Sequence, residues 1–358
     1  PGASVAIVKD GKLLYAKGYG FKDIKKNLPV TEKTLFPIAS CTKSFTSAAL
    51  AILADEGKLD WNKPIKEYLP DFQLQDEFAT RTIAARDLVS HRTGLARHDL
   101  TWLYANLGRQ SLYQNLKYLP LSKPLYAQYQ YNNLMFMTAG VLIERVSGKS
   151  WENFLREKIL QPLGMNQTVL TYPELFQKED YALSYRDSNG QWTEQGFGSN
   201  VDAIGPAGSI KSNVVEMANW LIMQLNKGKF GDKQIVSAAN LKENHTPQII
   251  VSPAEATFSE LGYASYGMGW SINTYRGHLR LAHNGSIEGY RSQMAFFPND
   301  NIGVVILTNT GAVDYYFVNA VCNYFSDKWL NLPVIDWTPR LKIAQAEAKA
   351  KLEKAKLD

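Results

Sequence analysis

Ser40 and Lys43 form the spacing Ser-x-x-Lys where an extended segment gives way to an apolar helix. Residues i and i+3 share one face of a helical turn, so the hydroxyl and the amine can point into one cleft. A serine hydroxyl is a weak nucleophile until a neighbour takes its proton, and a lysine in a partly dry, cationic site can do so. The spacing indicates nucleophilic acyl transfer. Taken alone, it also fits a helix N-cap followed by a solvated lysine.

The residues after Lys43 favour the chemical interpretation. Positions 44–54 are small or apolar almost all round, which predicts a helix inside a domain rather than on its surface. A lysine at the start of such a helix needs either a catalytic role or a buried ion pair.

Tyr131 and Asn133 follow an aromatic loop and precede a second apolar helix, predicted at 134–146. A phenol at a helix start loses its proton more readily near the positive end of the helix dipole and a nearby ammonium, so Tyr131 could share a proton with Ser40. Asn133 offers donors and an acceptor to a substrate amide. The alternative is an aromatic loop that only packs on the helix.

His283, Gly285 and Ser286 lie at the end of a predicted strand. Gly285 has no side chain and would allow a substrate to approach the strand edge closely. The backbone N–H of Ser286 could form half of an oxyanion hole, with the N–H of Ser40 as the other half. The His283 imidazole could bond Tyr131 or a substrate carboxylate, and a free pKa of about 6.5 predicts a rate that varies around pH 6 to 7.

Two kinds of periodicity divide the rest of the chain. Two β-rich runs joined by an Asp-Gly turn predict an N-terminal hairpin, and further strands predict an antiparallel meander near the C-terminus. The predicted strands are 4–8, 13–19, 269–273, 279–282, 292–297 and 303–308, and the main predicted helices are 40–56, 85–91, 134–146, 214–226 and 313–329.

The two ends of the chain should meet in one sheet, because a lone hairpin cannot bury its own face. We therefore expect an α/β (α+β) fold, with an antiparallel sheet flanked by helices built from about 1–60 and 195–335. An all-helical region is expected at about 61–194, with the active site between the two regions. Residues 1–337 then form one domain, and 338–358 form a charged helical tail or a linker.

The composition argues against several other classes of protein. The net charge is +5, from 39 Lys and Arg against 34 Asp and Glu, which predicts no nucleic-acid partner. No run approaches the roughly 20 apolar residues of a membrane-spanning helix. Cys41 and Cys322 are expected to be free thiols, and two cysteines are too few for a metal cluster. The sequence contains neither His-Glu-x-x-His nor Gly-x-Ser-x-Gly, so we do not expect a metalloenzyme or an α/β-hydrolase.

In order and spacing, these motifs resemble those of the beta-lactamase-related serine hydrolases. This family includes class C beta-lactamases, DD-carboxypeptidases, D-aminopeptidases and a group of bacterial esterases. Three pairs match its three elements: Ser40 with Lys43, Tyr131 with Asn133, and His283 with Gly285. Further matches lie at 87–95, 146–150 and 206–210, within a resemblance that covers roughly 1–330. The resemblance implies a beta-lactamase/DD-peptidase-like catalytic domain at 1–337 that needs no cofactor and no metal.

By the same resemblance, Ser40 is the acylated nucleophile, Lys43 and Tyr131 handle its proton, and Asn133 contacts the acyl amide. One departure matters. Penicillin-hydrolysing members usually carry Lys-Thr-Gly as the third element, where this chain has His-Asn-Gly at 283–285. A group that is mostly neutral at pH 7 replaces a permanent cation, so binding of a beta-lactam carboxylate should weaken. The His-x-Gly form looks more like that of D-aminopeptidases and related peptidases or esterases.

The expected function is a serine hydrolase that forms an acyl-enzyme from amide or ester bonds. A peptidase for D-amino-acid-containing peptides or a carboxylesterase is favoured. The alternatives are a beta-lactamase or DD-carboxypeptidase acting on beta-lactams or peptidoglycan peptides, and a non-catalytic penicillin-binding-like protein. The partner is expected to be a small-molecule or peptide substrate, and the oligomeric state stays open.

The ends of the sequence give two further expectations. The chain does not begin with Met, so we expect it to start inside the natural sequence, with a periplasmic or secreted location favoured over a cytoplasmic one. The tail resembles the segment that joins such domains to a C-terminal β-barrel module.

Overall fold

The computed structural model describes residues 1–188, 190–251, 258–311 and 314–354. Its centre is an antiparallel sheet of eight strands in the order β11-β12-β13-β14-β15-β16-β1-β2. The strands are β1 (Ala3–Lys9), β2 (Lys12–Tyr19), β11 (Ile249–Ile250), β12 (Ser265–Tyr266), β13 (Ser271–Tyr275), β14 (His278–Ile287), β15 (Tyr290–Phe297) and β16 (Ile302–Thr308). Because β1 pairs with β16, the two chain ends share one sheet, and the predicted fold class is confirmed.

The N-terminal hairpin forms where the sequence predicted it. Asp10 and Gly11 both have positive φ, 49° and 73°, as a two-residue turn between twisted strands requires. Successive side chains of a strand point to opposite faces, and here Val5 packs in one hydrophobic core while Ala6 packs in the other. The sheet therefore has a covered face on each side.

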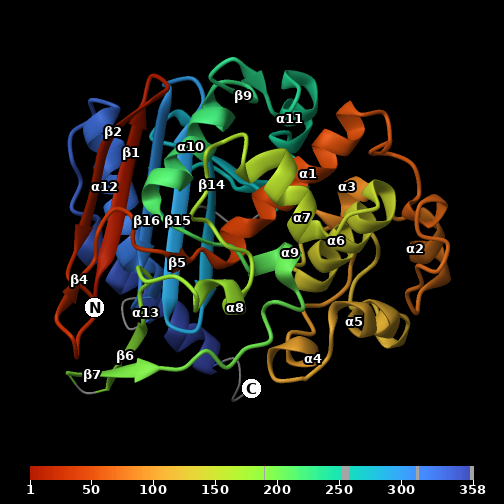
Figure 1. The fold of residues 1–358 in the computed structure, drawn as a ribbon, viewed down its shortest axis with the longest axis horizontal. Helices are drawn as coiled ribbons and strands as arrows, with labels where there is room; N and C mark the ends of the chain where they lie inside the picture. Colours follow the sequence, from red (N-terminus) through yellow and green to blue (C-terminus); the bar gives the residue numbers. More distant parts are fainter. Residues whose placement is uncertain (189, 252–257, 312–313, 355–358) are drawn as a thin grey trace.

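Helices provide both covers (Figure 1). α10 (Val214–Leu225) packs on β1, β2 and β16, and α12 (Asp314–Trp329) packs on the opposite face, over β15 and β16. α13 (Trp337–Lys354) lies against α12 and includes most of the predicted helical tail. The first residue of the predicted covering helix, Val313, and the end of the tail, 355–358, lie outside the described residues.

A mostly helical part lies beside the sheet (Figure 1). Its two long helices, α1 (Thr42–Asp55) and α6 (Asn133–Ser147), are buried over most of their length, as their apolar sequences predicted. The shorter helices are α2 (Glu77–Thr82), α3 (Ala85–Leu88), α4 (Leu100–Leu103), α5 (Arg109–Asn115), α7 (Trp151–Leu155), α8 (Tyr172–Leu175), α9 (Gly205–Gly208) and α11 (Ala238–Asn244). Single turns of 3₁₀ or π helix occur at η1 (Ala39–Cys41), η2 (Ile65–Glu67), η3 (Leu116–Tyr118) and η4 (Arg156–Leu160).

The stretch 61–194, expected to be all-helical, also contains a β-hairpin. β6 (Ser184–Ser188) pairs with β7 (Gln191–Gln195), and most of its residues are exposed. An exposed hairpin needs no alternation of apolar and polar residues, so the periodicity on which the helical expectation rested carried no sign of it. Smaller pairs join β3 (Phe21–Asp23) to β4 (Leu28–Pro29), β5 (Phe36–Pro37) to β8 (Lys211–Ser212), and β9 (Lys229–Phe230) to β10 (Lys233–Gln234).

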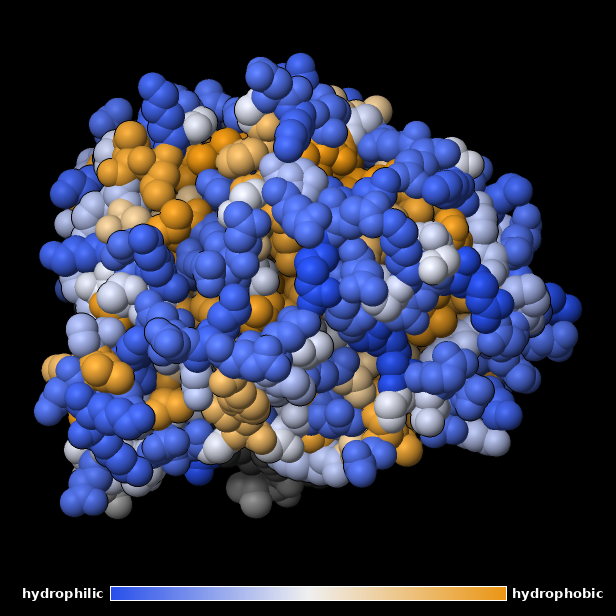
Figure 2. All heavy atoms as spheres, in the orientation of Figure 1, coloured by the Kyte–Doolittle hydropathy of each residue, from blue (hydrophilic) through white to orange (hydrophobic). Residues whose placement is uncertain are grey.

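Hydrophilic residues cover most of the face drawn in Figure 2, and apolar residues reach it in separate patches. Within the described ranges, no helix combines the length and the hydrophobicity needed to span a bilayer. Nor do three or more His, Cys, Asp or Glu side chains of those ranges gather where a metal ion could bind. Cys41 and Cys322 are buried free thiols, as expected, and burial raises their pKa to about 12 and about 11.

Asp327 joins α12 and α13 to the end of strand β13. Its carboxylate is fully buried and accepts hydrogen bonds from the Tyr275 hydroxyl at 2.7 Å and the Arg276 guanidinium at 2.7 Å. It also accepts from the Ile335 backbone N–H at 3.0 Å and the Trp337 indole at 3.4 Å. One carboxylate thus fixes α12, the start of α13 and the β13 end together.

We expect Asp327→Asn to lower the free energy of unfolding by about 3 kcal/mol. The substitution leaves the Arg276 guanidinium without its charge partner, and it places an amide N–H₂ where the carboxylate accepted hydrogen bonds from other donors. Urea unfolding measures this. The matched control is Asp232→Asn in an exposed turn, which should change stability by less than about 0.5 kcal/mol. Equal losses in the two variants would contradict the assignment.

Candidate active site

Ser40 occupies the 3₁₀ turn η1, and Lys43 follows in the first turn of α1. The Lys43 Nζ lies 3.2 Å from the Ser40 Oγ, so the Ser-x-x-Lys spacing brings the amine to the hydroxyl. Ala39, just before the serine, has a φ of 46°, a left-handed conformation that costs a non-glycine residue roughly 1–2 kcal/mol. Packing of η1 on β14 and β15 holds this strained turn in place.

Lys43 is fully buried, and its amine is surrounded by three oxygen acceptors. Besides Ser40, it donates to the Asn133 Oδ1 at 2.8 Å and to the Ala207 carbonyl at 2.7 Å. Burial lowers the pKa of Lys43 well below its ordinary value, and the nearby positive charge of Arg97 lowers it further, while Asp99 opposes this. In the neutral amine, two N–H groups can serve Asn133 and Ala207, which leaves the nitrogen lone pair for the Ser40 proton.

Asn133 is held in one orientation by Asp99. The Asn133 Nδ2 donates to the Asp99 Oδ1 at 3.0 Å, so the amide oxygen must face Lys43. Asp99 is fixed in turn by the Arg97 Nε at 2.6 Å and the Trp102 indole at 3.0 Å. The sequence predicted that Asn133 contacts the substrate amide; in the structure its side chain also completes the surroundings of the lysine.

Tyr131 lies on the other side of the serine, with its hydroxyl donating to the Ser40 Oγ at 2.6 Å. The Lys43 amine and the Arg97 guanidinium face its ring: the Lys43 Nζ and the Arg97 Cζ each lie 4.7 Å from the ring centroid. His91 packs against the same ring with 4.2 Å between centroids, and its Nδ1 accepts the Asn132 backbone N–H at 3.0 Å. These contacts fix the phenol next to the serine from two directions.

Gly285 and Ser286 bring β14 close to the nucleophile. A Cβ on Gly285 would lie 2.3 Å from the Ile38 carbonyl, so only glycine lets the strand pass this close. The sequence assigned that space to a substrate, whereas the structure fills it with the backbone that carries Ser40. Ser40 and Ser286 line the same cleft, as an oxyanion hole built from their N–H groups requires, and that role stays a prediction.

His283 differs from expectation in its partner and its charge. Its Nδ1 lies 2.7 Å from the Asn284 carbonyl, which can only accept, so the proton is on Nδ1 and the Nε2 accepts from the Tyr266 hydroxyl at 2.9 Å. The sequence offered Tyr131 or a substrate carboxylate as the partner of His283, whereas in the structure its ring nitrogens contact the Asn284 carbonyl and Tyr266, the last residue of β12. Burial, assisted by the charge of Lys43, lowers the pKa of His283 to about 3. A titration of this group at pH 6 to 7 is therefore not expected.

The cleft above Ser40 has a volume of about 670 Å³ and runs between α4, the segment that follows β7, and the end of β14. Asn133 and Ser286 also line it, together with charged side chains such as Asp99 and Glu288 and apolar ones such as Trp102. Tyr131 and His283 line a second hollow of about 260 Å³. The structure thus brings Ser40, Lys43, Tyr131 and Asn133 together, while His283 bonds Tyr266 and lines the second hollow.

Five groups at the site were not assigned a role from the sequence: Arg97, Asp99, His91, Tyr266 and the Ala207 carbonyl. His91 was interpreted only as the end of a short helix, and the motif at 206–210 was noticed as a match without a function. A backbone carbonyl has no side-chain signature, and Asp99 reaches Asn133 only through tertiary packing. The sequence around His91 is mixed, with Ser90 before it and Arg92 after it, and gives no signal that this side chain is buried at the site.

Comparisons with known proteins agree with this geometry. Residues 1–318 match the Beta-lactamase family. The unguisins hydrolase of Aspergillus campestris is 31% identical over 375 residues, which cover 99% of this chain and 68% of that protein. Protein flp of Staphylococcus aureus is 26% identical over 314 residues, or 86% of this chain and 59% of that protein. The chain thus spans about two thirds, or less, of the length of these relatives.

Two solved structures share the fold closely. The octameric penicillin-binding protein homologue from Pyrococcus abyssi superposes with a TM-score of 0.80 at 27% identity, over 93% of this chain and 74% of that one. The D-amino acid amidase from Ochrobactrum anthropi, solved with L-phenylalanine amide, gives a TM-score of 0.72 at 25% identity over 92% of each chain. Since the family match covers most of the sequence and the fold agrees, the chain belongs to the beta-lactamase family of serine hydrolases.

Proposed function

We propose that this hydrolase cleaves amide bonds of D-amino-acid-containing peptides or amides through an acyl-enzyme on Ser40. The observation that carries the proposal is the Lys43–Ser40–Tyr131 cluster, in which an amine at 3.2 Å and a phenol at 2.6 Å contact one hydroxyl that opens on a cleft. A nucleophile within hydrogen-bond reach of a base, itself oriented by further groups, is the arrangement that covalent catalysis needs.

Acylation begins when the Ser40 Oγ attacks the substrate carbonyl and its proton passes to the neutral Lys43 amine. The developing oxyanion rests on the N–H groups of Ser40 and Ser286, where a lost donor typically costs roughly 2.7–4 kcal/mol. The C–N bond then breaks, and the leaving amine takes a proton from Tyr131, which Lys43 restores. Water then attacks the acyl-enzyme ester and gives a proton to Lys43. The bond between the acyl carbon and the Ser40 Oγ breaks, the acid is released, and Lys43 returns the proton to Ser40.

The choice of an amide substrate rests on the cleft and the relatives. A volume of about 670 Å³ lies in the usual range for small-molecule sites, and apolar Trp102 and Leu103 line it beside the Asp99 and Glu288 carboxylates. Apolar walls suit an amino-acid side chain. Arg97 and Arg186 line the cleft as well as the carboxylates, so both the ammonium and the carboxylate of a peptide substrate find an opposite charge there. One relative is a D-amino acid amidase and another is an unguisins hydrolase, so we propose the same kind of bond here.

The third element supports an amide over a beta-lactam. His283 stands where penicillin-hydrolysing members usually have lysine, and it is neutral above about pH 3 because it is buried. A neutral imidazole that is already bonded to Tyr266 provides no cation for a beta-lactam carboxylate.

A fluorophosphonate probe should label Ser40, and Ser40→Ala should abolish labelling, because the hydroxyl at position 40 is the nucleophile. Labelled protein is measured by in-gel fluorescence and by mass spectrometry of the tryptic peptide. The matched control is Ser44→Ala, which removes a buried hydroxyl one turn further along α1 that bonds only the Cys41 carbonyl among the described contacts. Undiminished labelling of the Ser40 variant would refute the nucleophile assignment.

On a panel of D-phenylalanine amide, L-phenylalanine amide and a short-chain p-nitrophenyl ester, we expect the D-amide to exceed the L-amide in kcat/KM by at least about tenfold, or about 1.4 kcal/mol. Ammonia release reports the amides, and burst kinetics of the ester separate acylation from turnover. Ser40→Ala gives the background rate for each compound. Hydrolysis of the ester alone would reject the peptidase proposal and leave an esterase.

If neutral Lys43 is the base, the rate falls as pH drops through its pKa, which burial places below the free value of about 10.4. Arg97→Gln removes a neighbouring cation that lowers this pKa, so the acid limb of the pH–rate profile should move to higher pH by roughly half a unit. The control, Lys117→Gln, removes the same charge from an exposed position and should leave the limb in place. A shift toward lower pH in the Arg97 variant would contradict the assignment of Lys43.

A further inference from the structure

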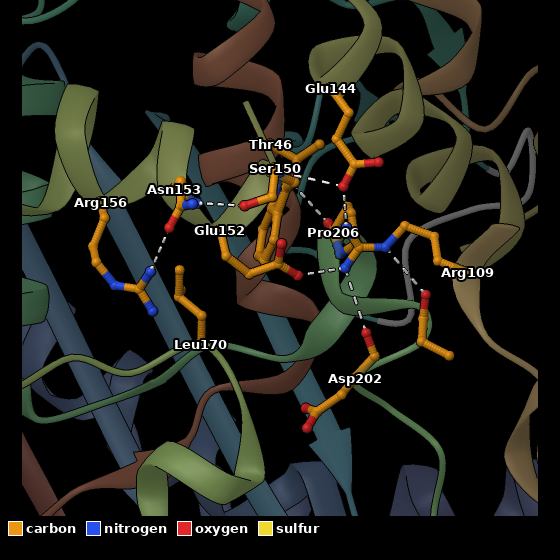
Figure 3. A network of polar contacts seen from close by, with 12 residues as sticks. Thr46, Arg109, Glu144, Ser150, Glu152, Asn153, Arg156, Leu170, Asp202 and Pro206 are labelled. Carbon is orange, nitrogen blue, oxygen red and sulfur yellow. Dashed lines mark hydrogen bonds and ion pairs between the residues drawn. The ribbon is translucent and has the colours of Figure 1, made fainter. Parts of the chain in front are cut away.

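Arg109, the first residue of α5, joins four parts of the helical region through one guanidinium (Figure 3). Its Nη1 donates to Glu144 of α6 at 2.6 Å, and its Nη2 donates to Glu152 of α7 at 2.5 Å. The same side chain reaches the backbone carbonyls of Asp202 and Ala203, each at 3.4 Å. Since its side chain is only 14% exposed, these contacts form in a largely dry setting where they are strong.

The two carbonyls belong to the segment 202–208, whose last four residues form the short helix α9. Other elements also hold this segment: the Thr46 hydroxyl of α1 donates to the Pro206 carbonyl at 2.7 Å, and the buried Lys211 amine contacts the Asp202 carboxylate at 3.0 Å. A Cβ on Gly140 of α6 would lie 2.1 Å from the Pro206 ring, so α6 and α9 are in close contact. This piece of the chain is therefore held by contacts from α1, α5, α6 and β8.

The far end of that piece supplies an acceptor to the reaction centre. The Ala207 carbonyl receives a hydrogen bond from the Lys43 Nζ at 2.7 Å, the shortest that the structure gives this amine. We propose that Arg109 is a positioning residue for Ser40 acylation: by holding the Asp202 and Ala203 carbonyls, it sets the Ala207 carbonyl that aims the Lys43 amine at the serine. This inference rests on the proposed function of Lys43.

A role in substrate binding does not explain these contacts, because Arg109 does not line the Ser40 cleft as the structure describes it. A role in charge pairing alone does not explain them either. Glu144 and Glu152 could be neutralised by a compact ammonium, whereas only a planar guanidinium can bind two carboxylates and two carbonyls in one fork. The lysine substitution therefore separates the pairing of charges from the positioning of the backbone.

Arg109→Lys and Arg109→Met are tested with the preferred compound of the substrate panel. We expect kcat to fall about tenfold in the lysine variant and about 100-fold in the methionine variant with KM nearly unchanged, because a misplacement of about 1 Å has effects of this size. Arg109→Lys should keep the parent's melting temperature within about 5 °C. The matched control is Arg156→Met, which removes a neighbouring cation that bonds Asn153 (Figure 3) and Glu174, both outside the 202–208 segment. This variant should retain the parent's kcat.

The pH profile gives a second readout that a purely structural role would not move. A carbonyl at 2.7 Å favours the ammonium form of Lys43, so losing it lowers the pKa and shifts the acid limb of kcat to lower pH. The charged and titratable groups that face Lys43 from other elements are Arg97, Asp99, Tyr131, His91 and His283, and the Arg109 variants leave all five in place. Cys41, on the same turn, is also unchanged.

A crystal structure of Arg109→Lys decides the inference independently of activity. We expect the distance between the Lys43 Nζ and the Ala207 carbonyl to exceed 3.5 Å, the limit for a hydrogen bond. A distance still near 2.7 Å would overturn the inference, as would a kcat and an acid limb equal to those of Arg156→Met. If the proposed function is wrong, the result is different: the parent enzyme itself is not labelled by the probe and hydrolyses none of the substrates.

Discussion

The burial of one amine is the constraint on which the site depends. Lys43 is inside the protein at the start of an apolar helix, where an unmatched charge would cost several kcal/mol. Its nitrogen can be accommodated only if oxygen atoms surround it, and these come from the preceding turn η1 and from two distant parts of the chain, the start of α6 and α9. The mutual placement of these three elements follows from satisfying a single side chain.

The same contacts that make the buried lysine tolerable also prepare it for proton transfer. Burial and Arg97 favour the neutral amine, while Asp99 and the two amide oxygens favour the ammonium. Burial is the largest of these effects, so the pKa falls well below that of free lysine. An amine whose neutral form is favoured, and which lies within hydrogen-bond distance of the Ser40 hydroxyl, is what a general base for Ser40 requires.

Two local rules of structure are broken close to the nucleophile. Ala39 adopts a left-handed conformation, and Gly285 allows β14 to approach the Ile38 carbonyl where any Cβ would collide. Such strain persists only when surrounding packing enforces it, and it concentrates at functional sites. Here β14, β15 and α9 pack against η1, the turn that carries Ser40.

The sequence by itself identified the residues that meet at the centre and the shared sheet of the two chain ends. Ser-x-x-Lys, Tyr-x-Asn, the Asp-Gly turn and strand alternation are local patterns, recorded within a few residues. Only the tertiary structure decided that Ala207 completes the lysine site, that Asp99 orients Asn133, and that His283 bonds Tyr266 and stays neutral. A carbonyl has no side-chain signature, and the pKa of a histidine depends on how deeply distant segments bury it, so neither is written in any short stretch of residues.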